Sequence, residues 1–164
     1  MQKKSLWINQ HYIKHSSPED LRPAVELLAQ QMNVDYNNGP ELTAVIAAFQ
    51  DRAKTVVELV EKSAFFYTGI TSYDEKAMAK HVNEDTRPLV ERVYEKLSSL
   101  DDWQEEKIQA LLTAIVDESG LKFGKVAQPI RLALTGGTVS PSLGVTLQLF
   151  GREKALSRLR DFIL

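Results

Sequence analysis

The stretch GKVAQPIRLALTG, residues 124–136, says most about how this 164-residue chain folds and what it does. It predicts one short helix, because a Gly-Gly pair follows its last turn. Lys125, Gln128 and Arg131 are spaced three apart, so a helix brings them close to one face. Pro129 stands inside the helical pattern and predicts a kink or a break, since proline has no backbone N–H to donate. A basic helix with an amide, ending in TGGTVSP, is typical of a recognition surface.

Composition sets the class of protein. The chain is 43% hydrophobic, enough to bury a core, and 164 residues suffice for one compact domain or two small helical subdomains. It has no cysteine, which excludes disulfides and thiolate metal sites and fits an intracellular protein. No apolar run approaches the roughly 20 residues needed to span a bilayer, and the N-terminal lysines precede no apolar signal segment. We therefore expect a cytoplasmic protein that contacts no membrane.

Charge is unevenly distributed along the chain. Residues 121–164 hold seven basic and two acidic side chains, whereas the first 120 residues hold 13 basic and 20 acidic ones. This asymmetry indicates an anionic partner for the C-terminal quarter. It is equally consistent with basic side chains that only coat a pair of short helices. The change in charge near Lys122 also predicts the boundary between two subdomains, 1–121 and 122–164.

Helical signals dominate the chain, and strict apolar–polar alternation is nearly absent, so we expect an all-α fold of two packed helical subdomains. Ser17 caps the first helix, with Pro18 in its first turn. Asp101 or Asp102 is expected to cap the helix that ends at Gly120. The expected helices cover about 18–32, 41–49, 55–66, 73–82, 87–100, 102–120, 125–134, a segment after 141, and 152–162.

Catalytic and metal-binding patterns are weak. His11 and His15 are four apart and could share a helix face, but two exposed histidines without a third ligand do not predict a metal site. The acidic pair Glu105-Glu106 fits the first turn of a helix better than acid–base chemistry. Phosphate-binding loops, dinucleotide-binding glycines and a nucleophile elbow are all absent. We therefore assign no catalytic residue and no metal ligand in this sequence.

Aromatic residues allow two interpretations. Phe65, Phe66 and Tyr67 could form a platform on which bases stack. Aromatic side chains at the end of an amphipathic helix more often belong to the core, and this is the interpretation we favour. Trp7 and Trp103 are interpreted in the same way.

Four strings of the sequence resemble one known family, and they occur in that family's order over nearly the whole chain. They are LWINQHYI (6–13), DRAKT (51–55), GKVAQPIR with ALTG and SP (124–141), and GREKALSRL (151–159). The chain is similar to the C-terminal anticodon-binding domain of bacterial glutamyl-tRNA synthetases. It departs from the family's pattern at Ser5, Val56 and Arg152. The catalytic region of that family, with its HIGH and KMSKS motifs, has no counterpart here.

The resemblance implies roles for particular residues. Arg52 stands at the position that reads the last anticodon base in the family. Arg131, Ser140 and Leu143 stand at the positions that surround the first anticodon base. An arginine offers a rigid fork of donors for the acceptor edge of an unstacked base, a hydroxyl can complete that hydrogen bonding, and leucine can pack on the base. Ser140 can equally cap the following helix.

The function that the resemblance implies is recognition of the glutamate tRNA anticodon loop by a monomer. The full enzyme would attach glutamate to tRNA using ATP, while this chain needs no cofactor of its own. Phosphate contacts are expected from Lys54, Lys125 and Lys154. The alternative is a helical interaction module whose basic quarter binds an acidic protein.

Overall fold

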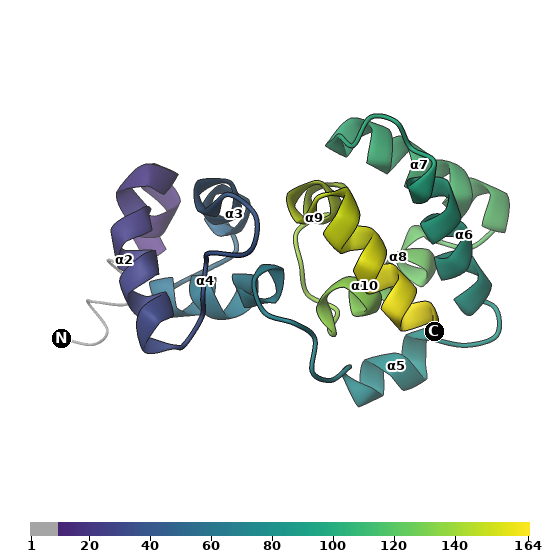
Figure 1. Ribbon diagram of the computed structural model, residues 1–164, viewed down its shortest axis with the longest axis horizontal. Helices are drawn as coiled ribbons and strands as arrows, with labels where there is room; N and C mark the ends of the chain where they lie inside the picture. The colour runs from purple at the N-terminus through teal and green to yellow at the C-terminus, as the bar shows by residue number, and fades with distance from the viewer. Residues whose placement is uncertain (1–9) are drawn as a thin grey trace. The chain divides into compact units, whose positions relative to one another are not determined.

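The protein is all-helical, as the sequence predicts. In the computed structural model, residues 10–164 are described and form helices joined by turns, with no strand among them (Figure 1). Residues 6–9, which belong to the first family-like string, lie outside the described residues, as does Trp7. Within residues 10–164, no helix has both the length and the apolar character needed to cross a membrane.

The chain divides into two compact units, and the division falls between Gly69 and Ile70. In the first unit, residues 10–15 are helical and α2 packs against α3 and α4. Ile13, Phe49 and Phe66 are among its fully buried side chains. Its remaining elements are α2 (Pro18–Gln31), α3 (Leu42–Phe49), α4 (Val56–Ser63) and the 3-10 turn η1 (Ala64–Phe66).

The second unit is a bundle of six helices among the described residues (Figure 1). The C-terminal helix α10 packs against α6, α8 and α9, while α7 packs against α6 and α9, and α5 packs against α8. The bounds are α5 (Glu75–His81), α6 (Arg87–Ser98), α7 (Glu105–Ser119), α8 (Phe123–Thr135), α9 (Leu143–Phe150) and α10 (Arg152–Ile163).

The observed boundary differs from the one predicted at residues 121 and 122. That position lies inside the second unit, in the turn between α7 and α8. Charge describes the surface of a helix, whereas packing is decided by the apolar faces. The apolar faces of α8, α9 and α10 are buried against α6 and α7, so the basic quarter does not form a unit by itself.

Two of the predicted helix starts have a local side-chain cap. The Ser17 and Thr55 hydroxyls accept hydrogen bonds from the amides of Asp20 and Glu58, as expected of N-caps. The predicted cap at Asp101 or Asp102 is wrong: α7 begins after Gln104, which makes no side-chain capping bond. Instead the amide of Glu105 donates to Oε1 of Gln148 on α9, at 2.6 Å.

Two expectations for residues 129 and 140 also need correction. Helix α8 is continuous through Pro129, whose side chain is buried, so proline does not break it. The cap of α9 is Ser142, whose hydroxyl accepts from the amide of Val145, and not Ser140. Pro129 is therefore a buried residue in the middle of α8, and Ser140 is a buried residue of the loop that follows this helix.

Candidate nucleic-acid interface

Arg131 is held in one orientation by two polar side chains. Its Nε donates to Oγ of Ser140 at 3.0 Å, and its Nη1 donates to Oε1 of Gln128 at 3.1 Å. Ser140 is only 7% exposed, and its own proton is donated to the carbonyl of Pro141 at 2.7 Å. A guanidinium fixed at Nε and at one terminal nitrogen keeps its planar fork in a defined direction.

The loop between α8 and α9, residues 136–142, is tied down by backbone contacts. Gly136 ends α8 with φ +82° and donates its amide to the Leu132 carbonyl at 2.8 Å. Its own carbonyl accepts from the amide of Asp74 at 2.8 Å. The Thr135 hydroxyl accepts from the amide of Gly137 at 3.0 Å. The loop that carries Ser140 is therefore anchored at its first residues.

The side chain of Leu143 is buried and does not reach the surface of the loop. Its side chain is 1% exposed, inside the core of the second unit, so it supports α9 in this structure and offers no surface to a ligand. The apolar side chain that this loop does expose is Val139, at 66%. Val139 directly precedes Ser140, which bonds Arg131. Sequence reasoning missed Val139 because a single valine in a loop carries no pattern.

Arg52 belongs to the first unit, in the turn between α3 and α4. Its amide donates to the Phe49 carbonyl at 3.0 Å, and its carbonyl accepts from Nζ of Lys62 at 3.1 Å. The side chain is exposed, and among residues 10–164 it makes no hydrogen bond or ion pair. The structure therefore brings Arg131 and Ser140 together and assigns Arg52 to the other unit.

Two arginines of the basic quarter are structural. Arg158 is 9% exposed, donates to the Leu134 carbonyl at 2.7 Å, and stands 4.7 Å from the ring centroid of Phe150. Burial lowers the pKa of Arg158 below its ordinary value. Arg152 donates to the carbonyls of Leu97 and Leu100 at the end of α6. The surface is therefore less basic than the seven cations of residues 121–164 indicate.

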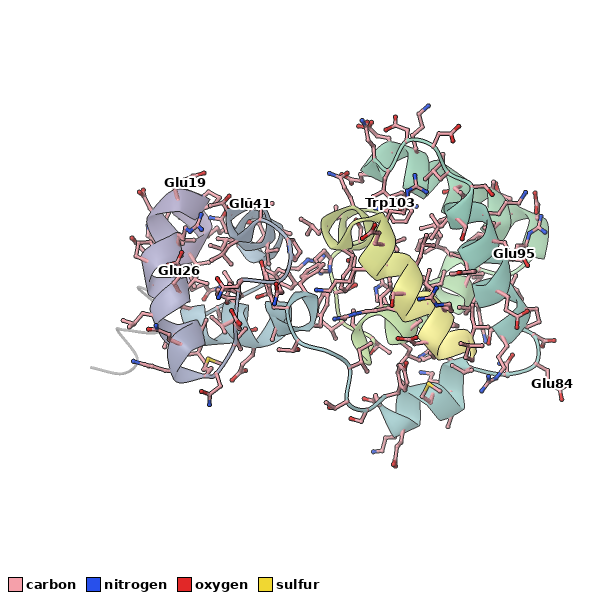
Figure 2. All side chains as sticks on the ribbon, in the orientation of Figure 1. Glu19, Glu26, Glu41, Glu84, Glu95 and Trp103 are labelled. Atoms are coloured by element: carbon pink, nitrogen blue, oxygen red, sulfur yellow. The ribbon has the colours of Figure 1, made fainter. Side chains whose placement is uncertain are left out.

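Trp103 is part of the same framework. The guanidinium of Arg152 lies 5.2 Å from the ring centroid of Trp103, whose indole N–H donates to the Leu147 carbonyl at 2.9 Å. Figure 2 shows Trp103 beside the end of the bundle where α9 lies. Trp103 is half-buried, so it packs against the bundle without belonging to the fully buried core.

The three expected phosphate-binding lysines differ in exposure. Lys54 and Lys125 are exposed, in the turn before α4 and in the first turns of α8. Lys154 is half-buried, and the pKa of Lys154 is lowered by burial and then by the nearby Arg158 charge. Lys54 and Lys125 are therefore the better placed of the three to meet an anion.

The aromatic cluster and the histidine pair are the remaining candidates from the sequence. Phe66 is fully buried and packs edge-on against Phe49, with centroids 6.3 Å apart, which supports the core interpretation. The rings of His11 and His15 lie 4.5 Å apart on the exposed face of the helical segment at residues 10–15. In the described part of the chain, no group of three or more histidine or acidic side chains is arranged to hold a metal.

These features define the chain as an all-helical module that presents an oriented arginine beside an anchored, partly apolar loop. The sequence profile of the family described as "Anticodon binding domain" matches residues 19–163. The chain belongs to this family.

The chain is also similar to glutamate–tRNA ligases. It is 44% identical to "Glutamate--tRNA ligase 2" of Coxiella burnetii (strain Dugway 5J108-111), over 95% of this chain and 33% of that protein. It is 38% identical to "Glutamate--tRNA ligase" of Legionella pneumophila (strain Philadelphia 1), over 96% of this chain and 34% of that protein.

A solved structure gives the same picture. The crystal structure of a glutamate tRNA ligase from Elizabethkingia meningosepticum, in complex with its amino acid, superposes with a TM-score of 0.86 and 29% identity. The match covers 99% of this chain and 32% of that one. The chain therefore spans about a third of the length of the relatives it matches.

Proposed function

We propose that this chain recognises the anticodon loop of glutamate tRNA and so selects the tRNA for a glutamate–tRNA ligase. Membership of the anticodon-binding family and the names of its relatives support this. The single observation that carries the proposal is the Arg131–Ser140 pair in an anchored loop. A fixed fork of N–H donors suits the acceptor edge of an unstacked base.

At the first anticodon base, Arg131 donates to the base edge. Ser140 acts mainly by orienting Arg131, because its proton is already given to the Pro141 carbonyl. Val139, and not the buried Leu143, supplies the apolar contact with the face of the base. At the last anticodon base, the exposed guanidinium of Arg52 donates to the base edge.

Phosphate contacts give affinity without selecting sequence. Lys54 and Lys125 approach the RNA backbone, with Lys154 as a weaker contact because it is half-buried. Neutralising phosphates releases counterions, so the affinity falls as salt rises. We expect each exposed lysine to contribute about 0.7 to the slope of log K against log salt on a single-stranded loop.

The full enzyme joins glutamate to its tRNA with ATP in this proposal. The 164 residues contain no glycine-rich phosphate loop, so the cofactor belongs to a region other than this one. The chain acts as a monomer in the cytoplasm. Pyrophosphate exchange driven by glutamate and ATP, measured on this chain alone, should stay at background. Exchange above background would contradict the proposal that ATP is used by another region of the enzyme.

The direct test is binding of the chain to the anticodon stem-loop of glutamate tRNA. We expect weak, salt-sensitive binding that exceeds binding to a stem-loop with a scrambled anticodon. Equal binding to both RNAs would overturn anticodon recognition and leave only charge attraction.

The alternative is a helical module that binds an acidic protein through the basic quarter. A single experiment separates the two: an acidic-surface binder is displaced equally by any polyanion, whereas an anticodon reader prefers its cognate loop. The family match favours the anticodon reader. The burial of Arg158 also takes one charge out of the basic surface that the alternative needs.

A further inference from the structure

The turn that carries Arg52 is gripped at two backbone atoms by one pair of side chains from α4. Nζ of Lys62 donates to the carbonyl oxygen of Arg52 at 3.1 Å. Oε2 of Glu58 accepts from the amide of Lys54 at 3.1 Å. The same two side chains form an ion pair, with Nζ and Oε1 2.6 Å apart. The Arg52 carbonyl belongs to the peptide group before Ala53, and the Lys54 amide belongs to the peptide group after it.

This arrangement differs from an ordinary ion pair on a helix surface. An exposed i,i+4 pair contributes little by itself, because solvent screens it. Arg22 and Glu26 make such a pair on α2, also at 2.6 Å, and the second contact of Arg22 is with another charged side chain, Glu41. In the pair on α4, each charged side chain also makes a hydrogen bond to the backbone of the Arg52 turn.

Contacts that hold the backbone of the turn matter for Arg52, because its side chain is not held in place by its own contacts with the described residues. It is exposed, and within residues 10–164 no hydrogen bond or ion pair holds its guanidinium. A free arginine loses rotamer freedom when it binds, and a mobile backbone beneath it would add to that loss. Below the turn, Ala53 is buried and its amide donates to the Phe49 carbonyl at 3.1 Å, so the turn is fixed from the core side as well.

We propose that Glu58 and Lys62 are positioning residues that fix the backbone of the Arg52 turn and so sharpen its reading of the last anticodon base. This inference rests on the proposed function, since it assumes that Arg52 contacts that base. Neither Glu58 nor Lys62 touches the RNA in this scheme. Substituting Glu58 or Lys62 should therefore change selectivity only at the last anticodon base. A general loss of stability would weaken recognition of the first and the last base alike.

The test uses Lys62→Met, which keeps the apolar stem of the side chain and removes the donor. Binding is measured to the cognate stem-loop and to stem-loops changed at the last or at the first anticodon base. We expect the preference for the cognate last base to fall about 2- to 10-fold, the scale of ordering one side chain. The preference at the first base should not change. Arg92→Met, which breaks the exposed Arg92–Glu118 pair, is the matched control and should change neither preference.

A charge swap separates a two-point grip from a simple ion pair. In the double variant Glu58→Lys with Lys62→Glu, opposite charges still face each other. A lysine at 58 cannot accept from the Lys54 amide, and a carboxylate at 62 cannot donate to the Arg52 carbonyl. We expect the swap to lose last-base preference as Lys62→Met does. Restored preference in the swapped protein would overturn the proposal.

Two further measurements make each outcome decisive. Hydrogen exchange of the Lys54 amide in the free protein should speed up in Glu58→Ala and not in Arg92→Met. Arg52→Gln is measured alongside: if it leaves last-base preference intact, the role of Arg52 in the proposed function fails, and this inference fails with it. If Arg52→Gln abolishes the preference while Lys62→Met and the swap leave it intact, only the positioning role is wrong.

Discussion

At the scale of single residues, the arginines of the C-terminal quarter have different tasks despite their equal charge. Arg131 is half-buried and oriented by Ser140 and Gln128. Arg158 is buried against a helix end, where a cation meets the negative end of the helix dipole. Arg160 is exposed. These three arginines carry the same charge in the sequence. Only the packing of α8 and α10 gives them different exposure and different partners.

For Arg131 we predict a loss confined to the cognate RNA. Arg131→Gln should weaken binding of the cognate anticodon stem-loop by about 1–3 kcal/mol, the usual worth of a good base-edge contact. The loss should shrink when the first anticodon base is already wrong. Fluorescence titration of labelled stem-loops measures both. Arg160→Gln is the control, and equal losses for the two variants would mean that Arg131 acts only through its charge.

For Arg158 we predict a loss of stability. Arg158→Met leaves the Leu134 carbonyl without its donor and removes the contact with the Phe150 ring. An unsatisfied buried acceptor costs about 1–3 kcal/mol. Chemical denaturation followed by circular dichroism gives the free energy of unfolding. Arg160→Met, at an exposed site on the same helix, should change it by less than about 0.5 kcal/mol. Similar values for both would show that Arg158 is not structural.

At the scale of elements, two helices end in the same way but with different surroundings. Gly120 after α7 and Gly136 after α8 both have positive φ, +72° and +82°. A Cβ at Gly120 would meet nothing within 4 Å, whereas a Cβ at Gly136 would lie 2.8 Å from the backbone oxygen of Ser72. Alanine substitutions at the two glycines can therefore distinguish two destabilising effects. Both variants have the unfavourable positive φ, and only the one at Gly136 also has the close contact with Ser72.

We predict that Gly120→Ala lowers the free energy of unfolding by about 1–2 kcal/mol, the cost of a left-handed conformation for a residue with Cβ. Gly136→Ala should cost more, because the segment at Ser72 must also move. The shift of the Ser72 segment should weaken anticodon binding in Gly136→Ala and not in Gly120→Ala. Thermal denaturation and stem-loop titration of both variants measure this. Equal stability losses would contradict the close contact.

The grip of α4 on the Arg52 turn should depend on pH. Hydrogen bonds from Lys62 and from the Lys54 amide lower the pKa of Glu58 below its usual 4.5. A lowered pKa means that the contribution of Glu58 to stability is present above about pH 4.5 and is lost as pH falls through the folded-state value. The difference in unfolding free energy between the natural protein and Glu58→Gln should therefore shrink below pH 4.5. A difference that is constant with pH would show that Glu58 is not ionised in this contact.

Helix positions were predictable from the sequence, and helix caps only in part. Ser17 and Thr55 cap by bonding an amide three residues ahead, which is a local pattern. The start of α7 has no such pattern, since Gln148 supplies the acceptor from 43 residues further along the chain. The break predicted at Pro129 is wrong because of tertiary packing too. Proline locally disfavours a continuous helix, but Pro129 is buried in the bundle and α8 continues through it.

At the scale of the whole molecule, the two compact units predict where the chain can be divided. Residues 70–164 contain the entire six-helix bundle, so this fragment should be helical and unfold cooperatively on heating. Residues 122–164 alone would expose the faces of α8, α9 and α10 that pack against α6 and α7, and should not fold. Circular dichroism of both fragments tests this. A cooperative transition in fragment 122–164 would restore the boundary that charge predicts.

The all-helical class and the approximate helix ranges could be predicted from the residues alone. The anticodon-binding family could be predicted from the family-like strings. These depend on local periodicity and on strings of adjacent residues. Three features became visible only once the helices were packed: which charges are exposed, that Leu143 is buried and Val139 is not, and that Lys62 contacts the backbone of Arg52. Burial and hydrogen bonds between distant residues arise only when helices pack, so no local pattern encodes them.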